Sequence, residues 1–337
     1  MKLKMMDYEI FKELVKEQFL NYLPAEFRDF GIRLETVHKT NGTLDGLAVV
    51  PPADRAGEVL PTVYLDHMYD DYVLGEDFRQ ALQNAAEKWV EAYENVPEAC
   101  RDFSLSGAEK RLMMELVNTE KNREMLAGMP HREFHDLSVI YRLVTGSDST
   151  AVYSSMVSSS MADLMGMDEQ QLYEAAFANT REMFPTEIKT MTEIMREIFI
   201  SEGNPGELAD LMIGEPEPVE TLYVITNEKR TFGAAAMLYE DGIHELAENI
   251  GTDLYVLPSS IHEVIAVSTS MGSAEEMARM VREVNAEQVG PEERLSDQVY
   301  FYDKNLRQLV PALAAPDRQL NGTAARTQPK CEAGRSR

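Results

Sequence analysis

The segment Leu257-Pro-Ser-Ser-Ile-His-Glu263 places an imidazole, a carboxylate and two hydroxyls in one short turn. The apolar runs on either side are typical of strands, so we expect this turn at the end of a sheet, where sites of α/β proteins often lie. His262 is the candidate general base or ligand, and Glu263 would orient it. Ser259 and Ser260 are candidate binding residues, although they lack the strand-to-helix elbow that exposes a hydrolase nucleophile. The simpler interpretation is structural: the serines satisfy turn amides, and His262 makes a supporting hydrogen bond.

Two other patterns contain possible metal ligands. His131 and His135 are four residues apart and followed by Asp136, but Pro130 indicates a passage from loop into strand, where this spacing does not bring the rings together. His244 and Glu245 match the start of the zinc-protease motif HExxH, but Glu248 occupies the position of the second histidine. We therefore expect no metal and no cofactor, and keep His131 only as a possible helper of His262.

An acidic and aromatic cluster follows the third predicted strand. Its candidate binding residues are Asp66, Tyr69, Asp70 and Asp71. The spacing does not match a calcium-binding EF-hand loop, and a solvated acidic loop explains the residue types. The same mixture also suits a surface that binds a basic partner.

The pattern of apolar residues predicts an α/β (α+β) protein of two to three units, with mixed sheets and helices packed mainly on one face. Residues 1–96 read as helix, three strands and helix. Residues 97–215 read as a mostly helical unit, with a helix at Glu109–Leu116.

The third predicted unit, residues 216–304, has the order ββαββαβ. It includes a strand at Ala234–Tyr239 and a helix that begins after Ser273 and turns Met280 and Val284 inward, among other apolar residues. Residues 305–337 contain six basic and two acidic residues and are expected to form a disordered basic tail.

Charge excludes several classes of partner. The chain has 58 acidic and 32 basic residues, a net charge of −26, so direct binding to nucleic acid or to anionic membranes is not expected. Only two cysteines occur, Cys100 and Cys331, which argues against a disulfide scaffold. No signal peptide and no membrane-spanning run are found, and the cytoplasm is the expected location.

A family resemblance rests on three segments, Leu116–Val139, Asp253–Ile265 and Val281–Tyr302. The motifs LDGLAV and PTVYLDHMYDDY in the first unit fit the same family. Together they resemble an uncharacterised domain-of-unknown-function family of acidic proteins from anaerobic gut bacteria and their mobile elements. The resemblance covers about residues 5–303. It implies one architecture across the three units and a bacterial intracellular origin. It supplies no catalytic residue, because the family has no established activity.

Three functions remain open on these grounds. The first is a non-enzymatic protein-binding or regulatory module with a protein partner, possibly basic. The second is a hydrolase that uses His262 and Glu263 with His131. The third is an acidic mimic of nucleic acid that inhibits a nucleic-acid-binding enzyme.

Overall fold

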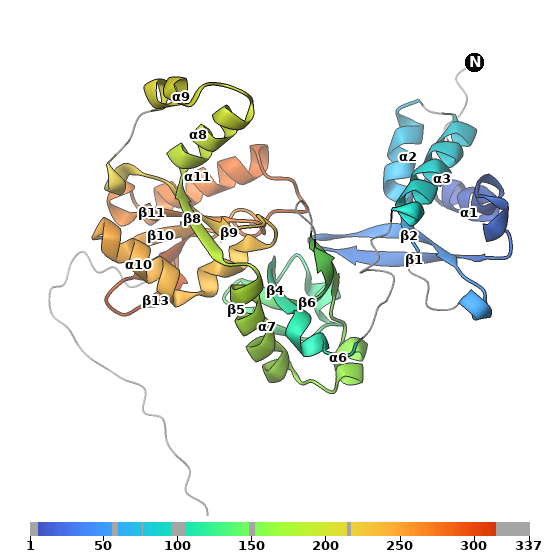
Figure 1. Cartoon of the computed structure of the whole chain (residues 1–337), viewed down its shortest axis with the longest axis horizontal. Helices are drawn as coiled ribbons and strands as arrows, with labels where there is room; N and C mark the ends of the chain where they lie inside the picture. The colour runs from blue at the N-terminus through green and yellow to red at the C-terminus, as the bar shows by residue number, and fades with distance from the viewer. Residues whose placement is uncertain are drawn as a thin grey trace, which may run out of the picture.

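A computed structural model describes residues 6–55, 60–75, 77–95, 105–147, 152–213 and 217–314 of the chain. These residues form three sheets with packed helices (Figure 1), which confirms the α/β class. In place of mixed ladders, the strand pairs described are all antiparallel. Cys100, Cys331, Glu76 and the tail after Ala314 lie outside the described residues.

The first unit is a three-stranded sheet with helices on one face. Its elements are α1 (Tyr8–Gln18), β1 (Gly31–Lys39), β2 (Gly42–Val50), β3 (Thr62–Tyr64), α2 (Leu65–Val73) and α3 (Phe78–Glu94). Asp7 caps α1 by accepting a hydrogen bond from the Glu9 amide at 3.0 Å. Trp89 from α3 and Leu47 from β2 belong to one apolar core beneath the helices.

One helix of this unit was not predicted. The acidic segment after β3 is α2 rather than a loop, and its buried residues, Leu65 and Met68, are three apart. Residues three apart lie on the same face of a helix. The many carboxylates in this segment led to its prediction as a solvated loop.

The second unit is built on a four-stranded sheet in the order β4-β6-β5, with β7 also paired to β6. Its elements are β4 (Leu112–Asn118), α5 (Arg123–Leu126), β5 (His131–Phe134), β6 (Leu137–Ser147), β7 (Val152–Met156), α6 (Ser159–Met165) and α7 (Glu169–Met183). The helix predicted at Glu109–Leu116 is therefore wrong, because most of that segment is β4. Both faces of β4 are buried, so its apolar residues do not alternate, and leucine and methionine favour helix by propensity.

After α7 the chain enters a six-stranded sheet, in the order β13-β12-β10-β11-β9-β8. The strands are β8 (Thr186–Thr190), β9 (Tyr223–Asn227), β10 (Leu254–Leu257), β11 (Val264–Ser268), β12 (Tyr300–Asp303) and β13 (Gln308–Pro311). The helices are α8 (Met191–Ser201), α9 (Gly206–Met212), the 3-10 helix η6 (Gly233–Leu238), α10 (Glu240–Ile250) and α11 (Ala274–Glu287). β8 lies inside the segment predicted as the middle unit, yet it pairs with β9.

This sheet corrects four predictions. The strand predicted at Ala234–Tyr239 is mostly η6, a buried 3-10 helix. Helices cover both faces of the sheet. The apolar residues of α10 belong to the core on one face, and those of α11 belong to a separate core on the other face. Met280 and Val284 on α11 are exposed rather than inward. The ordered structure continues beyond Lys304, where a disordered tail was expected, because β13 pairs with β12.

The second unit and the six-stranded sheet share one core. Residues of β4, β6, α7, η6, α10, β10 and β12 belong to a single apolar cluster. The first unit has its own core and reaches the others through the tip of the β1–β2 hairpin. Asn41 there donates from Nδ2 to the Arg294 carbonyl oxygen at 2.6 Å and from its backbone N to Asn122 Oδ1 at 2.7 Å.

Candidate functional site

The turn that carries His262 interlocks with the turn that joins β9 to η6. Gly233 approaches it so closely that an added Cβ would lie 2.4 Å from the His262 carbonyl oxygen. The hydroxyl of Thr226, on β9, donates to the same oxygen at 2.7 Å. Phe232 has a φ of +53°, which is costly for a bulky side chain. The two turns thus hold each other in place, with backbone strain beside His262.

Contacts to both nitrogens fix the His262 ring. Nδ1 accepts a hydrogen bond from the Phe232 backbone N at 3.2 Å, which places the proton of a neutral imidazole on Nε2. Nε2 lies 3.7 Å from a Glu293 carboxylate oxygen, and the side chain is 29% exposed. A general base needs a free acceptor nitrogen, and here that nitrogen already binds a backbone amide. The geometry favours a structural role for His262.

The two candidate serines hold this turn to the loop before β12. Ser260 Oγ accepts a hydrogen bond from the His262 backbone N at 3.1 Å, and the Ser259 carbonyl oxygen accepts one from Leu295 N at 2.9 Å. Both serines are buried. No hydrogen bond or ion pair among the described residues joins Glu263 to His262.

A buried ion pair also contacts Phe232. The Arg142 guanidinium stands 4.6 Å from the centre of the Phe232 ring and binds Glu115 at 2.8 Å. The Glu115 side chain is completely buried and also accepts a hydrogen bond from Thr40 Oγ1, in the β1–β2 hairpin, at 2.8 Å. This pair joins the first unit to the second, and it could not be predicted because its members are far apart in the chain.

His131 is not brought to His262 by any of these contacts. It lies on β5, in the other sheet, and its Nδ1 is 3.0 Å from the Met129 carbonyl oxygen. His135 has a φ of +59° and its Nε2 lies 3.3 Å from the Leu309 carbonyl oxygen. Within the described residues, no group of three or more His, Cys, Asp or Glu side chains is placed to hold a metal.

The acidic cluster divides between structural and exposed residues. Asp66 Oδ2 accepts a hydrogen bond from the Asp45 backbone N at 2.7 Å, and the Tyr69 hydroxyl donates to the Met6 carbonyl oxygen at 2.8 Å. Asp70 and Asp71 on α2 are exposed. Two of the four candidates therefore stabilise the first unit, and two face solvent.

The most unusual surface was not predicted as a site. The helical pair α8–α9 carries exposed apolar side chains, among them Met195 at 52%, Ile198 at 49% and Met212 at 66% exposure. α8 has no buried residue at all, and the pair lies at the outer edge of the molecule beside β8 (Figure 1). Nothing in the sequence warned of this exposure: Met191, Ile194, Met195, Ile198 and Phe199 follow the spacing of one ordinary apolar helix face, and only Ile200 lies off it.

The sequence of this helical pair is acidic. Residues 191–213 contain five acidic side chains and one basic side chain. The acidic residues are Glu193, Glu197, Glu202, Glu207 and Asp210. The surface is therefore both apolar and negatively charged.

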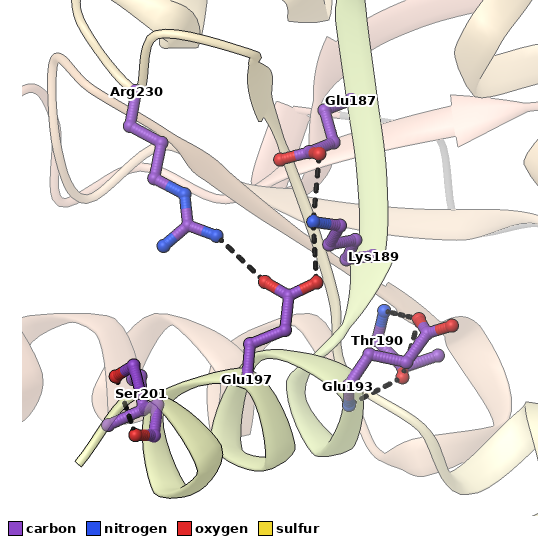
Figure 2. A network of polar contacts seen from close by, with 8 residues as sticks. Glu187, Lys189, Thr190, Glu193, Glu197, Ser201 and Arg230 are labelled. Carbon is purple, nitrogen blue, oxygen red and sulfur yellow. Dashed lines mark hydrogen bonds and ion pairs between the residues drawn. The ribbon is translucent and has the colours of Figure 1, made fainter. Parts of the chain in front are cut away.

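Polar contacts hold α8 against the sheet (Figure 2). The Lys189 ammonium, on β8, lies 2.7 Å from Glu197 and 2.8 Å from Glu187, and Arg230 approaches Glu197 at 3.2 Å. The hydrogen bond from Lys189 lowers the pKa of Glu197, so its carboxylate is charged at neutral pH. Thr190 caps the helix in a reciprocal capping box with Glu193. The apolar side chains of α8 thus stand on an anchored helix.

Three antiparallel sheets, two of them sharing a core, define a mixed α/β protein whose described contacts are mainly structural. A family model described as a family of unknown function, DUF5688, matches residues 8–304, and the chain belongs to this family. The searches of curated proteins and of solved structures found no match. Among the described residues, no helix is long and apolar enough to cross a membrane.

Proposed function

We propose that this chain is a non-enzymatic protein-binding module, and that the α8–α9 surface binds its partner. The observation that carries the proposal is the exposure of Met195, Ile198 and Met212 on an anchored helical pair. Exposed apolar side chains gathered on one helical pair are typical of a surface that binds another protein. The imidazole of His262, in contrast, is occupied by structural contacts.

The surface indicates the chemistry of the partner. An apolar helical face is commonly recognised by an amphipathic segment through side chains spaced three and four residues apart. The five carboxylates of this pair and the net charge of −26 favour basic residues beside those apolar contacts. We infer a partner segment with one apolar face and flanking lysines or arginines.

A synthetic helical peptide tests this proposal. The probe has leucines at helical spacing and lysines elsewhere, and its control is a scrambled peptide of the same composition. We expect the amphipathic peptide to bind about 10-fold tighter than the scrambled one by calorimetry, because only the former aligns its leucines. Binding should weaken as salt is raised, since exposed charges are screened.

The matched variants separate this surface from general charge attraction. Replacing Met195, Ile198 and Met212 with glutamine should remove the preference for the amphipathic peptide, while Leu74→Gln and Leu164→Gln, at exposed leucines elsewhere, should preserve it. Equal affinity for both peptides in the wild-type chain would contradict the proposal.

A further inference from the structure

The outer edge of the first sheet is a long strand whose backbone is paired on one side only. Among the described strands, β1 pairs with β2 alone, in one unbroken register along its nine residues, and it lies at the edge of the sheet (Figure 1). Beyond this ladder, no backbone–backbone hydrogen bond joins residues 31–39 to another described residue. An edge strand of this kind can pair with a strand of another chain.

The other strand edges in the described part of the chain are short, irregular or covered. β3, β5, β8 and β13 have three to five residues each, and β13 ends at Pro311. β7 has a register shift against β6. β4 is longer, but its Met114 amide donates to Thr180 Oγ1, on α7, at 2.9 Å. Short strands, prolines, bulges and covering helices protect sheet edges from pairing, whereas β1 is long and has neither a proline nor a bulge.

The hairpin geometry determines which backbone groups of β1 face outward. The turn between β1 and β2 has two residues, so the pair that closes it, Lys39 and Gly42, is hydrogen-bonded, and every second residue of β1 bonds to β2. The N–H and C=O groups of Ile32, Leu34 and Thr36 therefore point away from β2. The side chains of Ile32 and Leu34 are partly buried against the core of the first unit.

The sequence of β1 is self-complementary in one antiparallel register. A two-fold axis at Leu34 pairs this residue with its own copy and Ile32 with Thr36, so the outward-facing groups of both strands meet. The same register places Arg33 opposite Glu35 twice. An axis one residue to either side would oppose two arginines or two glutamates, which is unfavourable.

The two charged side chains contribute more to the register than to the affinity. Arg33 and Glu35 already form an ion pair within the strand at 2.8 Å, with side-chain exposures of 65% and 34%. Exposed pairs of this kind contribute little to stability, but they discriminate between alternative pairings. The affinity would come from the backbone hydrogen bonds and from the contact between the two copies of Leu34.

We propose that two copies of this chain pair through β1 and form an antiparallel dimer with one continuous sheet. The paired stretch is residues 31–37, which leaves the hairpin tip in contact with the other units. β1 has two basic residues and one acidic residue, so this edge does not add to the repulsion between two chains of net charge −26. The dimer surface is separate from α8–α9 and does not depend on the partner proposed for that surface.

Sedimentation velocity of the full chain, over about 1–200 µM, measures the self-association. We expect the mass to shift from that of the monomer to twice that value, with a dissociation constant on the order of 10 µM, because the interface is small. A chain that remains monomeric over the whole range would overturn the proposal.

Charge-reversed variants test the register. Arg33→Glu and Glu35→Arg each place like charges opposite each other, and each should weaken self-association by about 10-fold. An equimolar mixture of the two variants restores opposite charges at both positions and should dimerise like the wild-type chain. Glu91→Arg, at an exposed position on α3, is the control and should not change the dissociation constant. Undiminished dimers in both single variants, or a mixture that stays monomeric, would exclude this pairing of β1.

A proline tests the backbone contact independently of charge. Thr36→Pro removes an outward-facing N–H that the ladder with β2 does not use, and it should abolish the dimer. Thr36→Ala keeps this N–H and should retain the dimer. The fluorescence of Trp89, which is buried in the core of the first unit, checks that the unit stays folded. A folded Thr36→Pro chain that dimerises like wild type would contradict pairing through this edge.

Discussion

Gly233 lies where the turns before η6 and before β11 cross. Its backbone does not need the left-handed region, so the requirement for glycine is steric. An added Cβ would lie 2.2 Å from Thr226 Oγ1 and 2.9 Å from the Asn227 backbone N. These atoms belong to β9, which pairs with β11 on one side and β8 on the other, so the backbone there cannot move away without disturbing both strand pairs.

Gly233→Ala should therefore destabilise the chain by about 1–3 kcal/mol, the usual cost of overpacking. Gly242→Ala is the control, because its Cβ would lie 3.6 Å from the nearest atom, Ile188 Cδ1, and alanine favours a helix interior by about 0.5–1 kcal/mol. Urea unfolding measures both. Unchanged stability in Gly233→Ala would mean that the two turns do not interlock as described.

At the scale of elements, α7 is tied to the second sheet by a carboxylate. Arg132, on β5, binds Glu169 in a bidentate pair at 2.8 and 3.0 Å, and the Tyr141 hydroxyl, on β6, donates to it at 2.5 Å. Burial alone would raise the pKa of Glu169, but the hydrogen bonds from Arg132 and Tyr141, together with the guanidinium charge, lower it overall.

A lowered folded-state pKa makes this contact sensitive to acid. Its contribution to stability is fully present above the unfolded pKa of about 4.3 and is lost as the pH falls through the folded value. Below about pH 4.5, the unfolding temperature of the wild-type chain should therefore fall more steeply with decreasing pH than that of Glu169→Gln. Thermal unfolding at a series of pH values measures this difference. Glu174→Gln, at an exposed position one turn later, should follow wild type, and parallel profiles for all three chains would exclude the proposed role of Glu169.

The sequence predicted elements whose apolar residues follow one clear period. The β1–β2 hairpin, α3 and α11 are such elements, and the structure has them in the predicted order along the chain. β4 was mistaken for a helix because both of its faces are buried, which removes the alternation that marks a strand.

The candidate sites were less predictable than the elements. The residue types around His262 indicated a turn at a sheet end correctly, but which nitrogen is free depends on Phe232, thirty residues earlier. The α8–α9 surface is exposed because no other element packs over it in the described structure, and the sequence alone does not show which apolar helix face is left uncovered. Glu115 and Arg142 could not be paired without knowing the register of β4 and β6.

At the scale of the whole molecule, the first unit is joined to the rest through few contacts. Trp89 is the single tryptophan of the chain and is buried in the core of that unit. Its fluorescence therefore reports the unfolding of the first unit, whereas far-ultraviolet circular dichroism reports all units. At the junction, Asn122 Nδ2 donates to Asn41 Oδ1 at 2.9 Å.

Asn41→Gly should weaken this junction without straining the backbone, because Asn41 has a φ of +63° that glycine adopts freely. We expect the Trp89 transition to move to lower urea by the equivalent of about 1–3 kcal/mol, since partly buried partners lose their hydrogen bonds. The circular dichroism midpoint should shift less, so the two transitions separate. A Trp89 transition that does not move would show that the hairpin tip does not couple the units.

We propose that the chain binds its partner through α8–α9 and not through the His262 turn or the acidic residues of α2. Hydrogen–deuterium exchange on the full chain, with and without the saturating amphipathic basic peptide, locates the binding surface directly. We predict slower exchange in residues 191–212 and no change in residues 65–73 or 258–263. Protection confined to either of these two segments, or no protection in α8 and α9 at saturation, would contradict the claim.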